Sequence, residues 1–276
     1  MPVTGKKYFF IGSLAKGLDV MELLVERGDA SVSEVARALG FNRASSHRFL
    51  STLQELGYVD KSEQARYSAG MKLLEMGLRL AARLEVRKIS KPYMQRLAET
   101  FKETVNLGLY DSFEVLHVDK IDSLEILRID ARSGSRAPAY CTALGKVILA
   151  FLPPDEQAVF FKQVKLRRHG PNTIRSKKML KAALARIQEK GFAVDDEELS
   201  AGLRCVAAPI FDHNDRASYA LSISGPAVRL SLKRIERIQP RLRKCCREIS
   251  AKLGGNDGRY QSRHRPGADR QTRHRS

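Results

Sequence analysis

Apolar residues recur at helical spacing in two segments near the N-terminus. Residues 13–27 carry apolar side chains on one predicted face, at Leu14, Leu18, Met21, Leu24 and Val25. Ser13 suits the N-cap of this helix, and Gly28 is expected to end it. A second helix is predicted after Ser31, because Ser31 and Glu34 have capping-box spacing, in which each side chain bonds the other residue's backbone N–H.

A third helix is predicted after a turn at Gly40, where the missing Cβ permits positive φ. Asn42 can cap this helix, whose inward side is predicted to hold Phe49, Leu50, Leu53 and Leu56. The opposite side is small and polar, with Arg43 and Ser45 in the first turn beside Ala44, His47, Arg48 and Ser51. Two short strands follow near residues 58–59 and 66–68, and they place Lys61 and Arg66 on the arms of a hairpin. Residues 10–69 therefore predict a winged helix-turn-helix domain.

The next segment, residues 70–88, predicts one helix with two apolar stripes. One stripe passes through positions 71, 74, 78 and 81, and the other through 73, 77, 80 and 84. A helix that is apolar on two faces needs two partners, so we expect it to pack on its own domain and on a second subunit. Burial within a single chain is the alternative. Residues 70–90 are accordingly assigned as a linker helix.

From residue 91 the pattern changes to short strand-like runs separated by helices. Strands are predicted at residues 105–111, 113–121, 124–132, 192–199, 203–212 and 219–225. Helices are predicted at residues 91–104, 141–152, 155–164, 176–191 and 231–253. Pro92 falls in the first turn of the first of these helices, and Pro240 is expected to kink the last. This order predicts an antiparallel α+β domain over residues 91–253.

The distribution of charge matters more than its total. The formal net charge of +18 suggests a polyanionic partner. Residues 1–70 nevertheless hold 9 basic and 8 acidic side chains, so DNA binding by this part must rest on a few placed residues. Much of the excess lies in residues 171–253 and in the tail 254–276, which lacks apolar periodicity and is expected to be disordered. We expect these two regions to affect nonspecific affinity at most.

Composition argues against a membrane protein and against a metalloprotein. No apolar run reaches the roughly 18 residues that a membrane-spanning helix needs, so no membrane partner is expected. The four cysteines, which lack C-x-x-C pairing and zinc-ligand spacing, are Cys141, Cys205, Cys245 and Cys246. They predict reduced thiols in a cytoplasmic protein that binds no cofactor.

Several of these segments resemble the IclR family of bacterial transcription regulators. The resemblance is carried by "SVSEVARALGFNRASSHRFLSTLQELGYVD" near the N-terminus and, later, by "RSGSRAPAYCTALGKVILA" and "GFAVDDEELSAGLRCVAAPIFD". It covers roughly residues 10–253, in order. Ser46 departs from the family pattern, which usually has an aliphatic residue at this core-facing position, and the departure is expected to loosen the helix slightly.

The resemblance implies a DNA-binding regulator controlled by a small molecule. The second domain would be a GAF-like effector-binding domain for a small organic molecule, often a carboxylate. A homodimer, or a dimer of dimers (homotetramer), would place two recognition helices on a pseudo-palindromic operator in double-stranded DNA. The residues expected to contact DNA are Arg43, Ala44, Ser45, His47, Arg48, Ser51, Lys61 and Arg66.

The resemblance also implies an effector pocket. The backbone N–H groups of Ala143 and Leu144 would hold a carboxylate at a helix N-terminus. The matching polar positions are Asp195, Cys205, Ser222 and Ser224, and the apolar wall would come from Ile126, Ile129 and Ala137. Period-two alternation places both serines on one strand face, where both hydroxyls can point at one ligand. Aromatic acids, sugar acids and short keto acids all suit such a pocket.

The sequence gives less support to an enzymatic or metal-binding function of the second domain. Residues 195–198 are all acidic and Cys205 is a possible nucleophile, but no histidine lies beside it in a recognisable nucleophile arrangement. "TALGK" has too few glycines for a phosphate loop. A metal held by Asp195 and Cys205 is the weaker alternative, because no histidine has a suitable register. The sequence therefore predicts no enzyme.

Two other functions compete with gene regulation. In one, the polar face of the third helix is merely solvated, and the protein is a small-molecule-binding interaction module without specific DNA binding. In the other, the basic tail coats nucleic acid without sequence preference. A regulator differs from both, because it binds duplex DNA with a preferred sequence and a salt-sensitive affinity that survive truncation of the tail.

Overall fold

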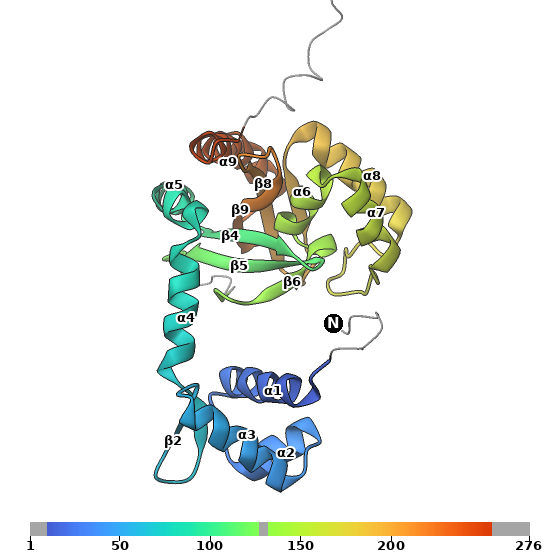
Figure 1. Ribbon diagram of the computed structural model, residues 1–276. Coiled ribbons are helices and arrows are strands. Elements are labelled where there is room, and N and C mark those ends of the chain that lie inside the picture. Colours follow the sequence, from blue (N-terminus) through green and yellow to red (C-terminus); the bar gives the residue numbers. More distant parts are fainter. Residues whose placement is uncertain (1–9, 127–131, 256–276) are drawn as a thin grey trace, which may run out of the picture. The chain divides into compact units, whose positions relative to one another are not determined.

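A computed structural model of the protein describes residues 10–126 and 132–255, and the chain divides after Arg83 into two compact units (Figure 1). The elements of the first unit are α1 (Gly12–Arg27), β1 (Asp29–Ala30), α2 (Val32–Leu39), α3 (Arg43–Glu55), β2 (Val59–Lys61), β3 (Tyr67–Ala69) and α4 (Met71–Ala82). Its three strands form an antiparallel sheet in the order β1-β3-β2. A core of fully buried side chains from α1, α2, α3 and β3 joins the helices to this sheet, including Val20, Leu24, Val35, Leu50 and Tyr67. The unit is the winged helix-turn-helix that the sequence predicts.

Local capping fixes the ends of α2 and α3. Ser31 Oγ accepts the Glu34 N–H at 3.3 Å and Glu34 Oε2 accepts the Ser31 N–H at 2.7 Å, which confirms the capping box. Gly40 ends α2 in the left-handed region at φ 66°, as its position in the turn requires. Asn42 Oδ1 then accepts the Ser45 N–H at 2.7 Å and starts α3. The turn between the two helices is therefore set by residues that the sequence identifies.

Three local predictions for this unit differ from the structure. The N-cap of α1 is Ile11, without a side-chain cap bond, and Ser13 lies inside the helix. Leu56, predicted to face the core, is the C-cap of α3 and is 53% exposed, because α3 ends before this residue can turn inward. Much of the predicted apolar face of α1 is also exposed, including Leu14, Leu18 and Val25.

The second unit is a sheet with helices on both faces. Its elements are α5 (Glu85–Phe101), β4 (Thr104–Asp111), β5 (Glu114–Ile121), β6 (Arg136–Pro138), the 3-10 turn η1 (Ala139–Cys141), α6 (Ala143–Phe151), α7 (Pro154–Gln163), α8 (Lys177–Lys190), β7 (Ala193–Asp196), β8 (Leu203–Phe211), β9 (Ala217–Pro226) and α9 (Leu232–Lys252). The strand order is β6-β5-β4-β9-β8-β7, and every neighbouring pair is antiparallel. The predicted α+β architecture is confirmed.

Alternate residues of the central strands serve two separate cores. Val105, Leu107, Leu221 and Ile223 pack with α5 and α9 on one face of the sheet. The other face packs against α6, α7 and α8, and this is the face that receives Asn106 and its neighbours on β9. Polar residues interleaved with apolar ones are therefore directed toward α6, where they can form a site. No helix in the described ranges is long and apolar enough to cross a membrane.

Helix boundaries between the two units differ from those predicted. The helices break at Arg83 and Leu84, and α5 begins at Glu85 instead of residue 91. Pro92 therefore lies inside α5 and not in its first turn. Burial of one face of α5, from Val86 to Ala98, explains why this helix tolerates the missing N–H of the proline. Similarly, α9 continues through Pro240.

The predicted strand at residues 124–132 is not seen in its described part. Leu124 and Ile126 are fully or almost fully exposed and lie outside the sheet, while residues 127–131 are outside the described residues. The strand β6, which the sequence did not suggest, pairs with β5 instead. The predicted disordered tail lies outside the described residues from residue 256 onward.

Candidate functional site

The outward side of α3, called here the recognition face, is open to solvent. Arg43, Ala44, His47 and Arg48 are exposed, and the half-buried members are Ser45 and Ser51. Within the described part of the chain, neither arginine of this face makes an ion pair. The face therefore presents cations and small polar groups that remain available to a partner.

The inward side of α3 accommodates the unusual Ser46. Its side chain is fully buried, and its hydroxyl donates to the Asn42 carbonyl oxygen at 3.1 Å. A buried hydroxyl with a partner avoids most of the desolvation penalty of an unpaired one. Leu50 remains fully buried one turn further along. The departure from an aliphatic residue is thus compensated by a local hydrogen bond.

The two basic residues predicted for the wing have different environments. Arg66 donates from Nε and Nη2 to the carboxylate of Asp29, each at 2.9 Å, and lies 3.2 Å from Glu34. It joins the wing to the start of α2, so its charge is already matched. Lys61 is exposed, with Nζ 5.4 Å from the centre of the Tyr67 ring. Of the two, only Arg66 has a carboxylate partner among the described residues.

A cavity of about 390 Å³, including its open mouth, lies in the second unit between the sheet and α6. It is called here the polar cavity. Its lining combines the N-terminus of α6 with polar groups from the sheet and two leucines: Asn106, His117, Thr142, Ala143, Leu144, Asp195, Leu199, Leu203, Cys205, Ser222 and Ser224.

Strand register gathers these residues from distant parts of the chain. Asp195 on β7 lies opposite Cys205 on β8, and Cys205 lies opposite Ser224 on β9. Asn106 on β4 lies opposite Ser222. Its Nδ2 donates to Ser224 Oγ at 3.1 Å and to Ser222 Oγ at 3.5 Å. The floor of the polar cavity is therefore a hydrogen-bonded row across adjacent strands.

Three side-chain atoms around the polar cavity have no partner among the described residues. They are Asn106 Oδ1, His117 Nδ1 and Asp195 Oδ2. Buried polar groups are nearly always hydrogen-bonded, so groups left unpaired at a cavity indicate contacts for water or a ligand. Burial also lowers the pKa of His117, which favours its neutral form. A neutral ring nitrogen can donate or accept according to its tautomer.

The N-terminus of α6 forms another wall of the cavity. Thr142 caps this helix, its Oγ1 accepting the Gly145 N–H at 3.0 Å. The N–H groups of Ala143 and Leu144 come earlier and, like the first N–H groups of any helix, have no acceptor within it. A Cβ at Gly145 would lie 2.2 Å from the Ala139 carbonyl oxygen, so glycine is needed for α6 to pack directly on η1. This end of α6 is suited to bind an anion.

A buried group of charges supports the same wall. Lys146 Nζ donates to the Val194 carbonyl oxygen at 2.7 Å and forms an ion pair with Glu198 Oε1. Asp195 Oδ1 accepts the N–H groups of Glu198 at 2.8 Å and Leu199 at 3.3 Å. Burial raises the pKa of Asp195 to about 7 and also raises that of Glu198. Asp195 therefore gains and loses its proton near neutral pH while it faces the cavity.

The structure brings together most, but not all, of the predicted pocket residues. Ala143, Leu144, Asp195, Cys205, Ser222 and Ser224 line the polar cavity. Ile126 is fully exposed and does not, because the segment that carries it lies outside the sheet. Ala137 is buried in β6 without reaching the cavity lining, and Ile129 lies outside the described residues. The wall is formed instead by Leu199 and Leu203.

Several residues of the polar cavity were not predicted from the sequence. Asn106 lies between Val105 and Leu107, and His117 lies between Leu116 and Val118, so a polar side chain between two apolar neighbours was the available signal. Thr142 directly precedes the α6 residues already assigned to the site, so its capping role was also open to prediction. Among the described residues, no group of three His, Cys, Asp or Glu side chains is placed to hold a metal ion.

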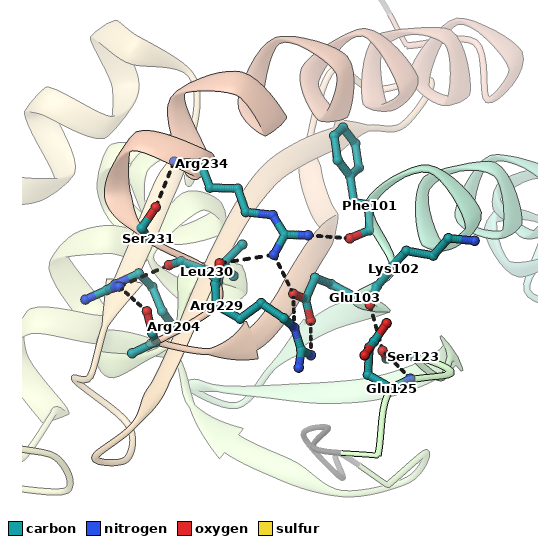
Figure 2. Close-up of polar contacts among 11 residues, drawn as sticks. Phe101, Lys102, Glu103, Ser123, Glu125, Arg204, Arg229, Leu230, Ser231 and Arg234 are labelled. Carbon is teal, nitrogen blue, oxygen red and sulfur yellow. Dashed lines mark hydrogen bonds and ion pairs between the residues drawn. The ribbon is translucent and has the colours of Figure 1, made fainter.

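A second polar cluster holds the strands of the cavity at one end, and Figure 2 shows its contacts. The Glu103 carboxylate is fully buried between Arg229, with contacts of 2.7 and 2.6 Å, and Arg234 at 3.0 Å. Arg234 Nη2 also donates to the Phe101 carbonyl oxygen at 2.6 Å, near the end of α5. These contacts tie α5 to the connection between β9 and α9. Both Glu103 oxygens have arginine partners and the side chain is fully buried, so we interpret the cluster as one that positions the strands.

Both parts of the chain match known proteins. Residues 13–63 match the IclR helix-turn-helix domain, and residues 78–251 match the bacterial transcriptional regulator IclR C-terminal domain. The HTH-type transcriptional regulator KdgR of Escherichia coli is 34% identical over 248 residues, which are 90% of this chain and 94% of that protein. The transcriptional repressor IclR of Escherichia coli is 30% identical, with 92% and 93% covered. The crystal structure of the Thermotoga maritima IclR has a TM-score of 0.75 at 35% identity and covers 89% of this chain and 100% of that one.

Proposed function

The chain belongs to the IclR family, whose members are transcriptional regulators and not enzymes, with a DNA-binding helix-turn-helix and an effector-binding C-terminal domain. We propose that this member binds a pseudo-palindromic operator through the recognition face of α3, and that a small hydroxylated organic acid in the polar cavity controls that binding. The observation that carries the effector part is the set of three unpartnered polar atoms at the cavity. The relatives are bacterial DNA-binding regulators, so the proposed place of action is the cytoplasm.

The DNA-binding part is supported by the exposure and chemistry of the recognition face. Arg43 and Arg48 are exposed cations without a carboxylate partner in the described chain, and arginine suits both guanine edges and phosphates. His47 and Ser51 can donate to phosphate oxygens, and Ala44 leaves room for close approach. The wing contributes Lys61, whereas Arg66 is assigned to holding the wing in place because Asp29 already binds it.

The test of the recognition face compares two charge-neutralising variants in the full chain. A preferred duplex is first selected by the wild-type protein from a random-sequence pool. Arg43→Gln with Arg48→Gln is expected to weaken binding to it by about tenfold or more, because each arginine that reads a base edge contributes discrimination. Arg27→Gln, at the exposed end of α1, removes one charge away from the recognition face and should bind within twofold of wild type. Unchanged affinity in the double variant would contradict the assignment.

Self-association is proposed from apolar surface that the single chain leaves uncovered. On α4, Met71, Leu74, Leu78 and Leu80 are each more than half exposed. Exposed apolar side chains that recur on one helix mark an interaction surface. A dimer would also supply the second recognition helix that a pseudo-palindromic site requires.

Sedimentation of full-length variants tests the dimer. Leu74→Asp with Leu78→Asp places charges on the uncovered surface and is expected to yield monomers. Arg79→Asp introduces the same side chain at an exposed position of the same helix and should leave the oligomer intact. A wild-type protein that sediments as a monomer would defeat this proposal.

The effector class follows from the chemistry of the polar cavity. An anionic group fits the N–H groups of Ala143 and Leu144 at the start of α6. Asn106 Oδ1 is an acceptor, and Asp195 Oδ2 is one when the carboxyl is ionised, so the ligand should also supply donors. A small acid with hydroxyl groups meets both requirements. Keto acids without hydroxyls, and unsubstituted aromatic acids, would leave these acceptors unpaired.

A thermal-shift comparison of acids with the full-length protein tests this class. Hydroxylated acids are expected to raise the melting temperature more than matched acids that lack hydroxyls, because ligands that bind the native state stabilise it. Ser222→Ala with Ser224→Ala should abolish the shift, whereas Ser218→Ala, on β9 but outside the cavity lining, should retain it. Stabilisation by an acid that persists in the double variant would place the effector elsewhere.

Control of DNA binding requires that the effector prefer one state of the protein. The change in operator affinity can be no larger than the difference between its affinities for the two states. An effector that stabilises the protein without changing operator affinity would support the alternative, an interaction module. Fluorescence anisotropy of the selected duplex, with and without the stabilising acid, distinguishes these outcomes.

A further inference from the structure

One segment of the second unit carries an unusual concentration of positive charge. Residues 157–188 contain nine lysines and arginines and no aspartate or glutamate, so they hold half of the chain's formal net charge of +18. All nine side chains are exposed: Lys162, Lys165, Arg167, Arg168, Arg175, Lys177, Lys178, Lys181 and Arg186. They are called here the basic segment. It covers α7 from residue 157 onward, the connection to α8 and most of α8.

None of these nine residues has an acidic partner in the described structure. The contrast is with arginines elsewhere that each have a carboxylate within 3.3 Å, namely Arg66, Arg87, Arg136, Arg204 and Arg216. Glu156, the acid just before the segment, is itself bound by Arg216. Nine unmatched like charges repel one another, and a polyanion would relieve that repulsion.

Packing gathers the middle of the segment into one surface. Lys177 Nζ donates to the Phe161 carbonyl oxygen at 2.5 Å, and Lys181 Nζ lies 5.0 Å from the centre of the Phe161 ring. The beginning of α8 therefore lies against the end of α7, which carries Lys162, and Figure 1 shows the two helices side by side. Charges that are up to 19 residues apart in sequence are thus brought onto adjacent helices.

The composition of this surface distinguishes among possible polyanions. Its two phenylalanines, Phe160 and Phe161, are buried, so no aromatic platform is available for the bases of a single strand. Its exposed large apolar residues are Val159 and Met179, too few to insert into a membrane. Lysine and arginine side chains bind duplex phosphates without reading sequence. Duplex DNA is also the polymer to which the first unit brings the protein.

We propose that the basic segment is a second, sequence-independent contact surface for the phosphate backbone of duplex DNA. This builds on the proposed operator binding and adds a contact made by the effector-binding unit itself. Once α3 has engaged its site, phosphates of the same DNA molecule are at high effective concentration for the basic segment. The contact strengthens binding to any duplex and leaves the preference between sequences unchanged.

The experiment measures full-length protein binding to a random-sequence duplex of about 40 base pairs, long enough for several phosphate contacts, across a salt series. The test variant combines Lys165→Gln, Arg168→Gln, Arg175→Gln and Lys178→Gln, at exposed residues whose side chains form no ion pair with any described residue. The control variant removes the same charge from the exposed side of α9, by Lys233→Gln, Arg237→Gln, Arg241→Gln and Lys244→Gln. Circular dichroism of both variants serves as the test that they are folded.

Each phosphate contact contributes about 0.9 to the slope of log affinity against log salt. The test variant is therefore expected to lower the slope by about 2 to 4 and the affinity by about tenfold or more, whereas the control changes the slope by less than about 1. An unchanged slope in the test variant, or equal losses in both variants, would overturn the proposal. The proposal would also be overturned if the test variant lost binding to anionic vesicles or to single-stranded DNA but not to the duplex.

The same proteins separate this inference from the operator-binding proposal. The ratio of affinities for the selected and random duplexes should be unchanged in the test variant and should fall in the Arg43→Gln, Arg48→Gln variant. If the Arg43→Gln, Arg48→Gln variant keeps the wild-type ratio of affinities, only the assignment of the recognition face is contradicted. A ratio that falls in the test variant would contradict the sequence independence of the basic segment.

Discussion

The recognition face of α3 and the polar cavity are built in opposite ways. The recognition face comes from one helix, and its arginines and histidine are exposed. The cavity collects groups from strands more than 100 residues apart in sequence, and Asn106, Asp195, Ser222 and Ser224 are each less than 5% exposed. A change on the exposed face should therefore alter binding while leaving stability intact, whereas a change in the cavity should alter both.

The sharpest test of this contrast is the buried ion pair beside the cavity. Lys146→Met is expected to lower the free energy of unfolding by about 3–5 kcal/mol, because it leaves Glu198 buried without its cation. Lys162→Met, at an exposed position of the same unit, is the control and should change stability by less than about 0.5 kcal/mol. Both are measured by denaturant unfolding followed by circular dichroism.

A second variant separates loss of the pair from loss of packing. Lys146→Met combined with Glu198→Leu removes both charges and should recover a large part of the lost stability. If the double variant is as unstable as Lys146→Met alone, the unpaired charge is not the cause of the damage.

The next largest effect concerns pH and Asp195. Because burial raises its pKa to about 7, the native state holds this proton more tightly than the unfolded chain does. Its contribution to stability is therefore complete below about pH 4 and is lost as the pH rises toward and through 7, by up to about 4 kcal/mol. Asp195→Asn should flatten this part of the pH profile of unfolding. A variant with the same profile as wild type would show that Asp195 does not titrate in this range.

A smaller effect on stability is expected from the N-cap of α3, the helix that carries the recognition face. Asn42→Ala removes the acceptor for the Ser45 N–H and should reduce stability by about 1 kcal/mol, whereas Asn42→Gly should cost only a few tenths. Thr52→Ala, an exposed change within α3, serves as the control. Differential scanning calorimetry of the full-length variants measures the difference in their stability. Equal stability of the Ala and Gly variants would contradict the capping role.

The smallest effect is expected at Arg66, which joins the wing to α2. Since Asp29 and Glu34 already match its charge, Arg66→Ala should change duplex affinity by no more than about twofold and leave the salt slope nearly constant. Asp29→Ala should instead raise affinity slightly, because it partly releases the guanidinium. A large loss of affinity in Arg66→Ala would return this residue to the DNA-contact set.

Much of the fold was predictable because it depends on contacts between near neighbours in sequence. The capping box at Ser31 and Glu34, the turn at Gly40 and the cap at Asn42 all join residues within a few positions of one another. The start of the long α5 was not predictable, because it depends on burial of Val86 against a sheet whose strands lie later in the sequence. Local sequence patterns could not predict that this packing would allow the helix to continue past Pro92.

By itself, the sequence determined the helix-turn-helix, the outward side of α3 and the alternation that places Ser222 and Ser224 on one strand face. Only the tertiary structure decided that Asn106 and His117 join them, that Ile126 does not, and that three buried polar atoms remain unpartnered. The physical reason is strand register. The pairing of Asn106 with Ser222 spans 116 residues, and a hydrophobic pattern identifies a strand without specifying which residue of another strand it will meet.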